Sequence, residues 1–173
     1  MSEKKLALVT GASRGIGRQI ALGLADDGHK VIAISRSAME TSDLSASQKS
    51  LIISIRGDVS DASFIERLEK QVSKEHGVVQ ILVNAAGVFG PIDLVHNSDP
   101  AQWTQTIVID AIAPYYTAHY FLPAMLKSKW GRIINLSSAA ALHPPGPLNS
   151  AYGTSKVALN QLTRHIAAEI AGS

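Results

Sequence analysis

Short apolar runs alternate with segments of helical periodicity along most of the chain. The apolar runs contain few polar residues, which is typical of strands that are covered on both faces of a sheet. Five runs are predicted to be strands, at residues 6–10, 31–35, 51–56, 81–83 and 132–136. Because strands and helices alternate, we expect parallel strands joined by right-handed crossovers. The pattern therefore predicts an α/β fold with a doubly wound parallel sheet, in one domain over residues 1–173.

Four other segments have the period of helices. They are residues 15–27, a segment that starts after Ser60 or Asp61, a long segment that starts after Ser98 or Asp99, and a last helix from about Ala151 to near the end of the chain. Gly28 is well placed to end the first helix in a left-handed conformation. Pro114 and Pro123 fall within the long helix, where we expect a bend or break.

The segment TGASRGIG, residues 10–17, joins the first predicted strand to the first predicted helix. Gly11 allows a sharp turn, Gly15 lets the backbone approach a pyrophosphate, and Gly17 lets the helix pack closely against the sheet. The N-terminus of the helix presents free N–H groups and a partial positive charge to phosphates. The position predicts a dinucleotide site, and a glycine-rich turn without a ligand is the alternative.

The last predicted helix carries Tyr152 and Lys156 four residues apart, which places both side chains on one face. A free tyrosine has a pKa of about 10, and a nearby ammonium favours the phenolate. Such a pair can pass a proton to or from a substrate oxygen near neutral pH. The alternative is an amphipathic helix with an inward tyrosine and a lysine that reaches solvent.

Composition agrees with a folded domain and excludes several kinds of function. Hydrophobic residues make up 46% of the chain and charged residues 17%, so a globular protein is predicted. The net charge is +2 and no basic run is present, so we expect no nucleic-acid partner. Cysteine is absent, which excludes disulfides and thiol nucleophiles, and the six histidines form no recognisable metal-ligand motif. We therefore expect no metal site.

The termini and the longest apolar runs bear on location. No apolar run is long enough to span a bilayer, so no membrane partner is expected. The N-terminal sequence MSEKKLALVTG passes almost directly into the first strand, which leaves no room for a signal or transit peptide. The expected location is cytoplasmic.

Five motifs follow one another in a characteristic order: the G-x-x-x-G-x-G loop, GDV at 57–59, NAAG at 84–87, NLSS at 135–138 and YGTSK at 152–156. In this order the chain resembles the short-chain dehydrogenase/reductase family, and within it the NADP-dependent 3-oxoacyl-[acyl-carrier-protein] and carbonyl reductases. The resemblance implies a Rossmann-like sheet of strand order 3-2-1-4-5, with the cofactor and the catalytic helix in one domain. It also implies hydride transfer between NADP(H) and a carbonyl or secondary alcohol, with a 3-oxoacyl thioester or small ketone as substrate.

The resemblance assigns a cofactor-binding set along the motifs. Its members are Gly11, Ser13, Arg14, Gly15, Ile16, Gly17, Ser35, Arg36, Asp58, Val59, Asn84, Ala85, Ala86, Gly87, Tyr152 and Lys156. In the family, the acid at Asp58 hydrogen-bonds adenine, whereas a turn residue with a local backbone bond is the alternative. Asn84 is either part of the adenosine wall or a structural tie between strands.

The residues after the second predicted strand favour NADP. Family members that bind NAD place an acid near Ser35, where it holds the ribose hydroxyls. A serine there removes the charge that would repel a 2′-phosphate, and Arg36 and Arg14 can bind that phosphate. Two arginines that simply face solvent are the alternative.

The implied catalytic set is Ser138, Tyr152, Lys156 and Asp110. Ser138 would polarise the carbonyl, and Lys156 would also hold the nicotinamide ribose. The family usually has asparagine at the position of Asp110, where it holds a water that contacts the lysine. Aspartate carries charge and has no N–H donor, so it could pair with Lys156 or disturb that relay.

The family continues beyond this point with a sixth strand, a Pro-Gly turn, a mobile lid and a seventh strand. We therefore expect a fragment or truncated form whose fifth strand has an uncovered outer edge. A homo-oligomer through the helices near 100–128 and 151–171 is expected. A non-catalytic NADP-binding module and a dimerisation module are the alternatives to an enzyme.

Overall fold

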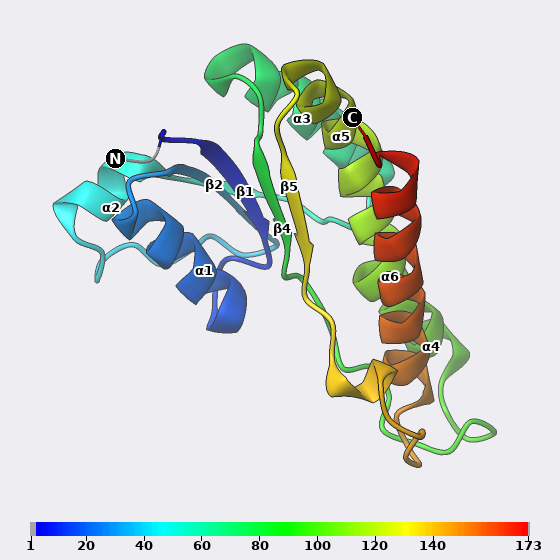
Figure 1. Ribbon diagram of the computed structural model, residues 1–173. Coiled ribbons are helices and arrows are strands. Elements are labelled where there is room, and N and C mark those ends of the chain that lie inside the picture. The colour runs from blue at the N-terminus through cyan, green and yellow to red at the C-terminus, as the bar shows by residue number, and fades with distance from the viewer. Residues whose placement is uncertain (1–2, 173) are drawn as a thin grey trace.

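Five parallel strands form the central sheet of the computed structural model, which describes residues 3–172 (Figure 1). They are β1 (Leu6–Thr10), β2 (Lys30–Ser35), β3 (Ile52–Arg56), β4 (Ile81–Asn84) and β5 (Arg132–Asn135). The strand order is β3-β2-β1-β4-β5, and each neighbouring pair is parallel. The predicted fold class and strand order are therefore confirmed.

Helices cover both faces of this sheet. They are α1 (Gly15–Asp26), α2 (Ala46–Leu51), α3 (Ala62–His76), α4 (Pro100–Ile107), α5 (Ala113–Ser128) and α6 (Ser150–Glu169). A π-helical turn, Val108–Ile112, joins α4 to α5, and a 3₁₀ turn, Ala139–Ala141, follows β5. Within residues 3–172, no helix combines the length and apolar character that crossing a membrane requires.

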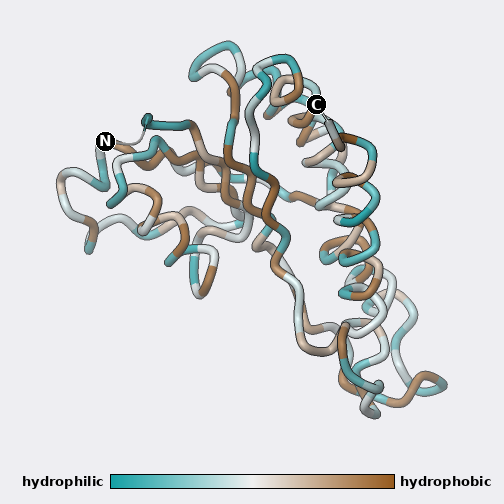
Figure 2. The backbone as a smooth tube through the Cα atoms, in the orientation of Figure 1, coloured by the Kyte–Doolittle hydropathy of each residue, from teal (hydrophilic) through white to brown (hydrophobic). Residues whose placement is uncertain are grey.

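The core has two layers, one on each side of the sheet. Leu8 of β1 packs in one cluster with Ile65 of α3 and Phe121 of α5. The next residue, Val9, packs on the opposite face with Ala21 of α1. Successive strand residues point to opposite faces, so a continuous apolar run serves both layers. Figure 2 shows the hydrophobic residues concentrated along the central strands.

The segment before β3 differs from the prediction. Leu51, predicted to begin a strand, is instead the last residue of α2, and β3 begins at Ile52. A capping box starts this short helix: Ser45 Oγ accepts from the Gln48 backbone N–H at 3.2 Å, and Gln48 Oε1 accepts from the Ser45 N–H at 3.0 Å. These reciprocal bonds satisfy two otherwise free N–H groups, which stabilises a helix that buries no side chain.

The predicted break in the long helix lies near Pro114 and not at Pro123. The π-helical turn ends just before α5, and Pro114 occupies the first turn of α5. Proline has no N–H, so Pro114 leaves the carbonyl of Asp110 without its usual helical donor, at the turn where the hydrogen-bond pattern changes. Pro123 lies inside α5, which continues through it to Ser128.

β5 forms one edge of the sheet. It pairs with β4, and among residues 3–172 no strand pairs with its other side. Ile134 in this strand is 48% exposed. A cavity of about 510 Å³ lies between α5, β5 and α6, with Leu126, Ile166 and Ile170 among its lining. The unpaired side of β5 agrees with the predicted uncovered edge of the fifth strand, whereas the cavity was not predicted.

Candidate active site

The carboxyl ends of the strands open into a cleft of about 1160 Å³. The strand order reverses at β1, which lies between β2 and β4, so the connections that follow β1 and β4 run to opposite sides of the sheet. Open α/β sheets bind ligands in the crevice at such a reversal. The predicted residues that line the cleft are Gly11, Ser13, Arg14, Gly15, Ile16, Gly17, Ser35, Arg36, Asp58, Val59, Ala85, Ala86, Gly87, Asp110, Tyr152 and Lys156. Two predicted residues, Asn84 and Ser138, do not line it.

The glycine loop is held tightly on one side and is open on the other. Gly11 has φ +68°, and a Cβ there would lie 2.7 Å from the backbone Cα of Ala86. Gly15 has φ +58°, but a Cβ there would meet no atom within 4 Å. Thr10 Oγ1 accepts the N–H groups of Ala85 and Ala86, both at 3.1 Å, which ties the loop to the segment after β4. The backbone therefore leaves free space at the N-terminus of α1, where a phosphate can approach.

Three arginines reach the end of the cleft beyond β2 and β3. Arg14 and Arg36 were predicted from the sequence, and Arg56 was not. The parallel register places Arg56 beside Ser35, and its Nε donates to the carbonyl of Arg36 at 3.2 Å. The only sequence signal for Arg56 is its place directly before the GDV motif. These guanidinium groups make this end of the cleft suitable for an anion.

Asp58 lies at the same end and forms a local turn. Its Oδ1 accepts from the Ser60 backbone N–H at 2.9 Å and from Ser60 Oγ at 2.7 Å. The alternative for Asp58, a turn residue with local bonds, therefore describes its contacts, while its side chain also lines the cleft.

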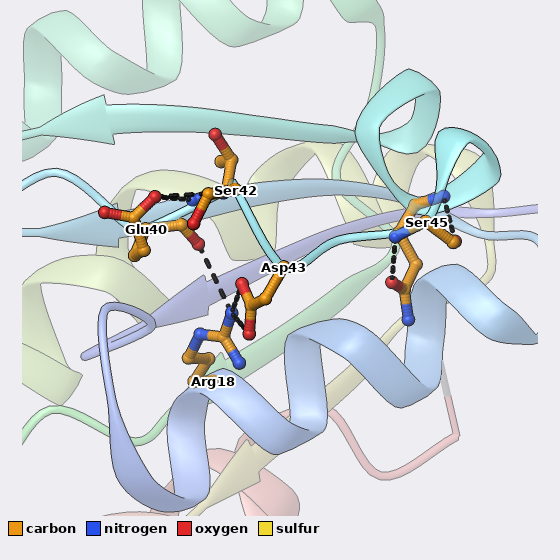
Figure 3. Close-up of polar contacts among 7 residues, drawn as sticks. Arg18, Glu40, Ser42, Asp43 and Ser45 are labelled. Carbon is orange, nitrogen blue, oxygen red and sulfur yellow. Dashed lines mark hydrogen bonds and ion pairs between the residues drawn. The ribbon is translucent and has the colours of Figure 1, made fainter.

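The segment that follows β2 is anchored to α1 by Arg18 (Figure 3). Arg18 Nη2 donates to Asp43 Oδ1 at 2.7 Å and to Oδ2 at 3.0 Å, and to the carbonyl of Glu40 at 3.3 Å. The backbone N–H of Ser42 bonds the Glu40 carboxylate and lowers the pKa of that group. These residues lie outside the lining of the cleft, and their contacts hold against α1 the segment that includes the lining residues Ser37 and Ala38.

Asn84 is buried and makes structural contacts. Its Nδ2 donates to Asn135 Oδ1 at 2.8 Å, and its Oδ1 accepts from Thr117 Oγ1 at 2.8 Å. These bonds connect β4 to β5 and α5. Of the two readings that the sequence left open, the contacts are those of a structural tie.

Tyr152 and Lys156 both face the cleft from the first turns of α6. Lys156 is only 4% exposed, its Nζ lies 5.5 Å from the centroid of the Tyr152 ring, and it donates to the carbonyl of Leu136 at 3.1 Å. Ser138 caps the 3₁₀ turn, because its Oγ accepts from the Ala140 N–H at 3.2 Å. The structure thus places the tyrosine and lysine together, and Ser137 rather than Ser138 lines the cleft.

Asp110 is fully buried in the π-helical turn beneath this pair. Its Oδ1 accepts from the Val88 N–H at 2.8 Å, and its Oδ2 lies 3.2 Å from Lys156 Nζ. Within residues 3–172, Oδ2 accepts no hydrogen bond of good geometry, so the contact with Lys156 is an ion pair. Burial raises the pKa of Asp110, and the Val88 bond and the Lys156 charge oppose that shift. The structure therefore shows the pairing with Lys156 that the sequence raised.

A second residue that the sequence reasoning missed is Phe89. Its ring stacks on the Tyr152 ring, with centroids 4.7 Å apart and an interplanar angle of 25°. Phe89 is the second residue after the NAAG motif, and that nearness was the only signal in the sequence.

A sequence profile described as short chain dehydrogenase matches residues 5–173, and the chain belongs to this family. It is 33% identical to the short chain dehydrogenase pigC of Monascus ruber, over 95% of this chain and 57% of that protein. It is also 33% identical to the 3-oxoacyl-[acyl-carrier-protein] reductase FabG of Staphylococcus aureus, over 99% of this chain and 70% of that protein. The chain thus spans little more than half the length of pigC.

A solved structure shows the same architecture. The metagenomic short-chain oxidoreductase in complex with NADP has a TM-score of 0.84 and is 35% identical, over 96% of this chain and 75% of that chain. Because the structural match covers 96% of this chain, it includes the sheet and the helices that form the cleft. The fold that positions the site is therefore shared with this relative.

Proposed function

We propose that this chain forms the cofactor-binding and catalytic part of an NADP(H)-dependent reductase of carbonyl compounds. The observation that carries the proposal is the presence of Tyr152 and Lys156 in the same cleft as the glycine loop. The similar protein FabG is a 3-oxoacyl-[acyl-carrier-protein] reductase by name, and this similarity supports a 3-oxoacyl or small ketone substrate for this chain.

The cleft suits a dinucleotide along its whole length. Free space above Gly15 and the N–H groups at the start of α1 suit the pyrophosphate. Arg14, Arg36 and Arg56 suit a 2′-phosphate. Tyr152 and Lys156 line the same cleft, and Lys156 donates to the carbonyl of Leu136 just after β5, whereas Arg36 and Arg56 lie at the ends of β2 and β3 on the other side of the strand order. NADP, when bound, supplies or accepts the hydride.

The residues of the chain handle the proton. Tyr152 gives a proton to the substrate oxygen in reduction and removes it in oxidation. The ammonium of Lys156, 5.5 Å from the tyrosine ring, favours the negative charge that develops on the phenol oxygen. Asp110 fixes Lys156 from below through the ion pair. Ser138 Oγ accepts from the Ala140 N–H, so its hydroxyl proton is free to donate a hydrogen bond to the substrate carbonyl in this proposal.

The charge at the far end of the cleft predicts a cofactor preference. NADPH is expected to bind more tightly than NADH, and Arg36→Ala should weaken NADPH binding by roughly ten- to a hundredfold, because one charged hydrogen-bonding partner of the phosphate is lost. NADH binding should change little. Titration by cofactor fluorescence measures both, with Arg67→Ala on the exposed surface of α3 as the control. Equal affinity of the unaltered chain for the two cofactors would contradict this prediction.

Hydride transfer is the direct test of the reaction. NADPH is expected to be oxidised only when a small diketone or a 3-oxoacyl thioester is present. The fall in NADPH absorbance measures the rate. Binding of NADPH without turnover on any of these substrates would favour the non-catalytic binding module. Failure to bind NADPH would remove the proposal altogether.

A homo-oligomer through α4, α5 and α6 remains part of the proposal. Tyr115 and Leu126 on α5 and Val157 on α6 are apolar or aromatic and are between 40% and 53% exposed. Exposed groups of this kind on adjacent helices suit contact with a second copy. Sedimentation of the chain at several concentrations measures this association.

A further inference from the structure

Phe89 places a large apolar ring in the cleft beside Tyr152, the proposed proton donor. It lies in the segment after β4 and is 49% exposed, while one side of its ring stacks on Tyr152. Phe89, Tyr152 and Lys156 line the same cleft. A molecule whose oxygen approaches Tyr152 therefore passes beside the exposed part of this phenyl ring.

The backbone on both sides of Phe89 is fixed. The Val88 N–H bonds Asp110 Oδ1 at 2.8 Å, and Asp110 is fully buried. On the other side, Gly90 has φ +80°, and a Cβ there would collide with the buried hydroxyl of Thr106 in α4. Residues 88–90 are thus held between the π-helical turn and α4, so the ring is positioned by the fold and not by chance on the surface.

We propose that Phe89 is a specificity-determining residue, which makes the site prefer carbonyl compounds with a flat aromatic group next to the carbonyl. The inference rests on the proposed function, in which Tyr152 contacts the substrate oxygen. Aromatic rings prefer offset or edge contacts with other aromatic rings, which add to the gain from burying area. A saturated ring of the same size buries similar area against Phe89 but makes no such contact.

Two ketones of equal carbon skeleton separate these effects, namely acetophenone and cyclohexyl methyl ketone. The chain is loaded with NADP⁺, which has no hydride to donate, and dissociation constants are measured by ligand-observed NMR. The unaltered chain is expected to bind acetophenone about two- to tenfold more tightly. Phe89→Leu, which keeps an apolar side chain of similar bulk, should reduce this ratio to about one.

Three further variants control for folding and for aromatic groups elsewhere. Phe89→Tyr keeps the ring and should keep the preference. Phe89→Met, a second replacement without a ring, should lose the preference and decides the question if Phe89→Leu folds poorly. Tyr115→Leu removes an exposed aromatic residue of α5 outside the cleft and should leave the ratio unchanged. Circular dichroism and an independent NADP⁺ titration establish that each variant is folded.

The outcomes distinguish this inference from the proposed function. Normal NADP⁺ binding with no preference in the unaltered chain, or with the same preference in Phe89→Leu, would overturn the role of Phe89 and leave the reductase proposal intact. Absence of NADP⁺ binding would overturn the reductase proposal itself. A lower ratio in Phe89→Leu, retained in Phe89→Tyr and Tyr115→Leu, is the result that supports the inference.

Discussion

Gly11→Ala is expected to lower the free energy of unfolding by about 2–5 kcal/mol. The left-handed backbone at φ +68° costs a non-glycine residue about 1–2 kcal/mol, and overpacking adds about 1–3 kcal/mol. The new Cβ would lie 2.7 Å from Ala86 Cα, 2.8 Å from Ala86 N and 2.9 Å from the carbonyl oxygen of Ala85. All three are backbone atoms of the segment that follows β4, so neither side can yield by a simple side-chain rotation.

Gly15→Ala is the matched control, because it separates backbone conformation from collision. Its φ of +58° is similar, but a Cβ there meets nothing within 4 Å. It should therefore cost only about 1–2 kcal/mol. Urea unfolding of the two variants measures the difference. If both variants lose the same stability, the close approach of Gly11 to Ala86 does not constrain the fold.

β1 could be predicted because its continuous apolar run corresponds to burial on both faces of the sheet. Leu8 and Val9 are both fully buried, on opposite faces, and a run of apolar residues is the only pattern that serves both. The helix α2 could not be found in this way, because none of its residues is buried and it depends on the local bonds between Ser45 and Gln48. A hydrophobic period is a weak signal for a six-residue helix whose Leu51 is only partly buried against the core.

The site was predictable as far as it follows from position on the strands. Residues at the carboxyl ends of neighbouring parallel strands converge whatever their sequence separation, and the ordered motifs supplied those residues. Arg56 could not be assigned because its relevance depends on its register beside Ser35. Phe89 depends on a stack across two segments, and the hydroxyl of Ser138 depends on how the following turn is capped. Such contacts are set by tertiary packing, which a single sequence does not specify.

At neutral pH, Lys156→Met is expected to lower the free energy of unfolding by about 3–5 kcal/mol. The side chains of Lys156 and Asp110 are 6% and 0% exposed, and methionine fills much of the space of the lysine. The variant therefore leaves a buried carboxylate without its counter-charge. Adding Asp110→Asn removes that charge and keeps an oxygen to accept the Val88 N–H, so the double variant should recover much of the loss.

The pH dependence of this difference identifies Asp110 as its source. Burial already raises the pKa of Asp110, and Lys156 opposes that shift, so Lys156→Met raises the pKa further. A carboxyl whose pKa is raised by folding favours the folded state below its unfolded pKa, and this contribution is lost as pH rises through the folded-state pKa. The single variant should therefore be least stable, relative to the double variant, at neutral and alkaline pH. As pH falls toward about 4, the ordinary range of an aspartate, the two should converge. Urea unfolding across this range measures the gap, and a gap that stays constant with pH would mean that the loss comes from packing of Lys156 and not from the buried charge of Asp110.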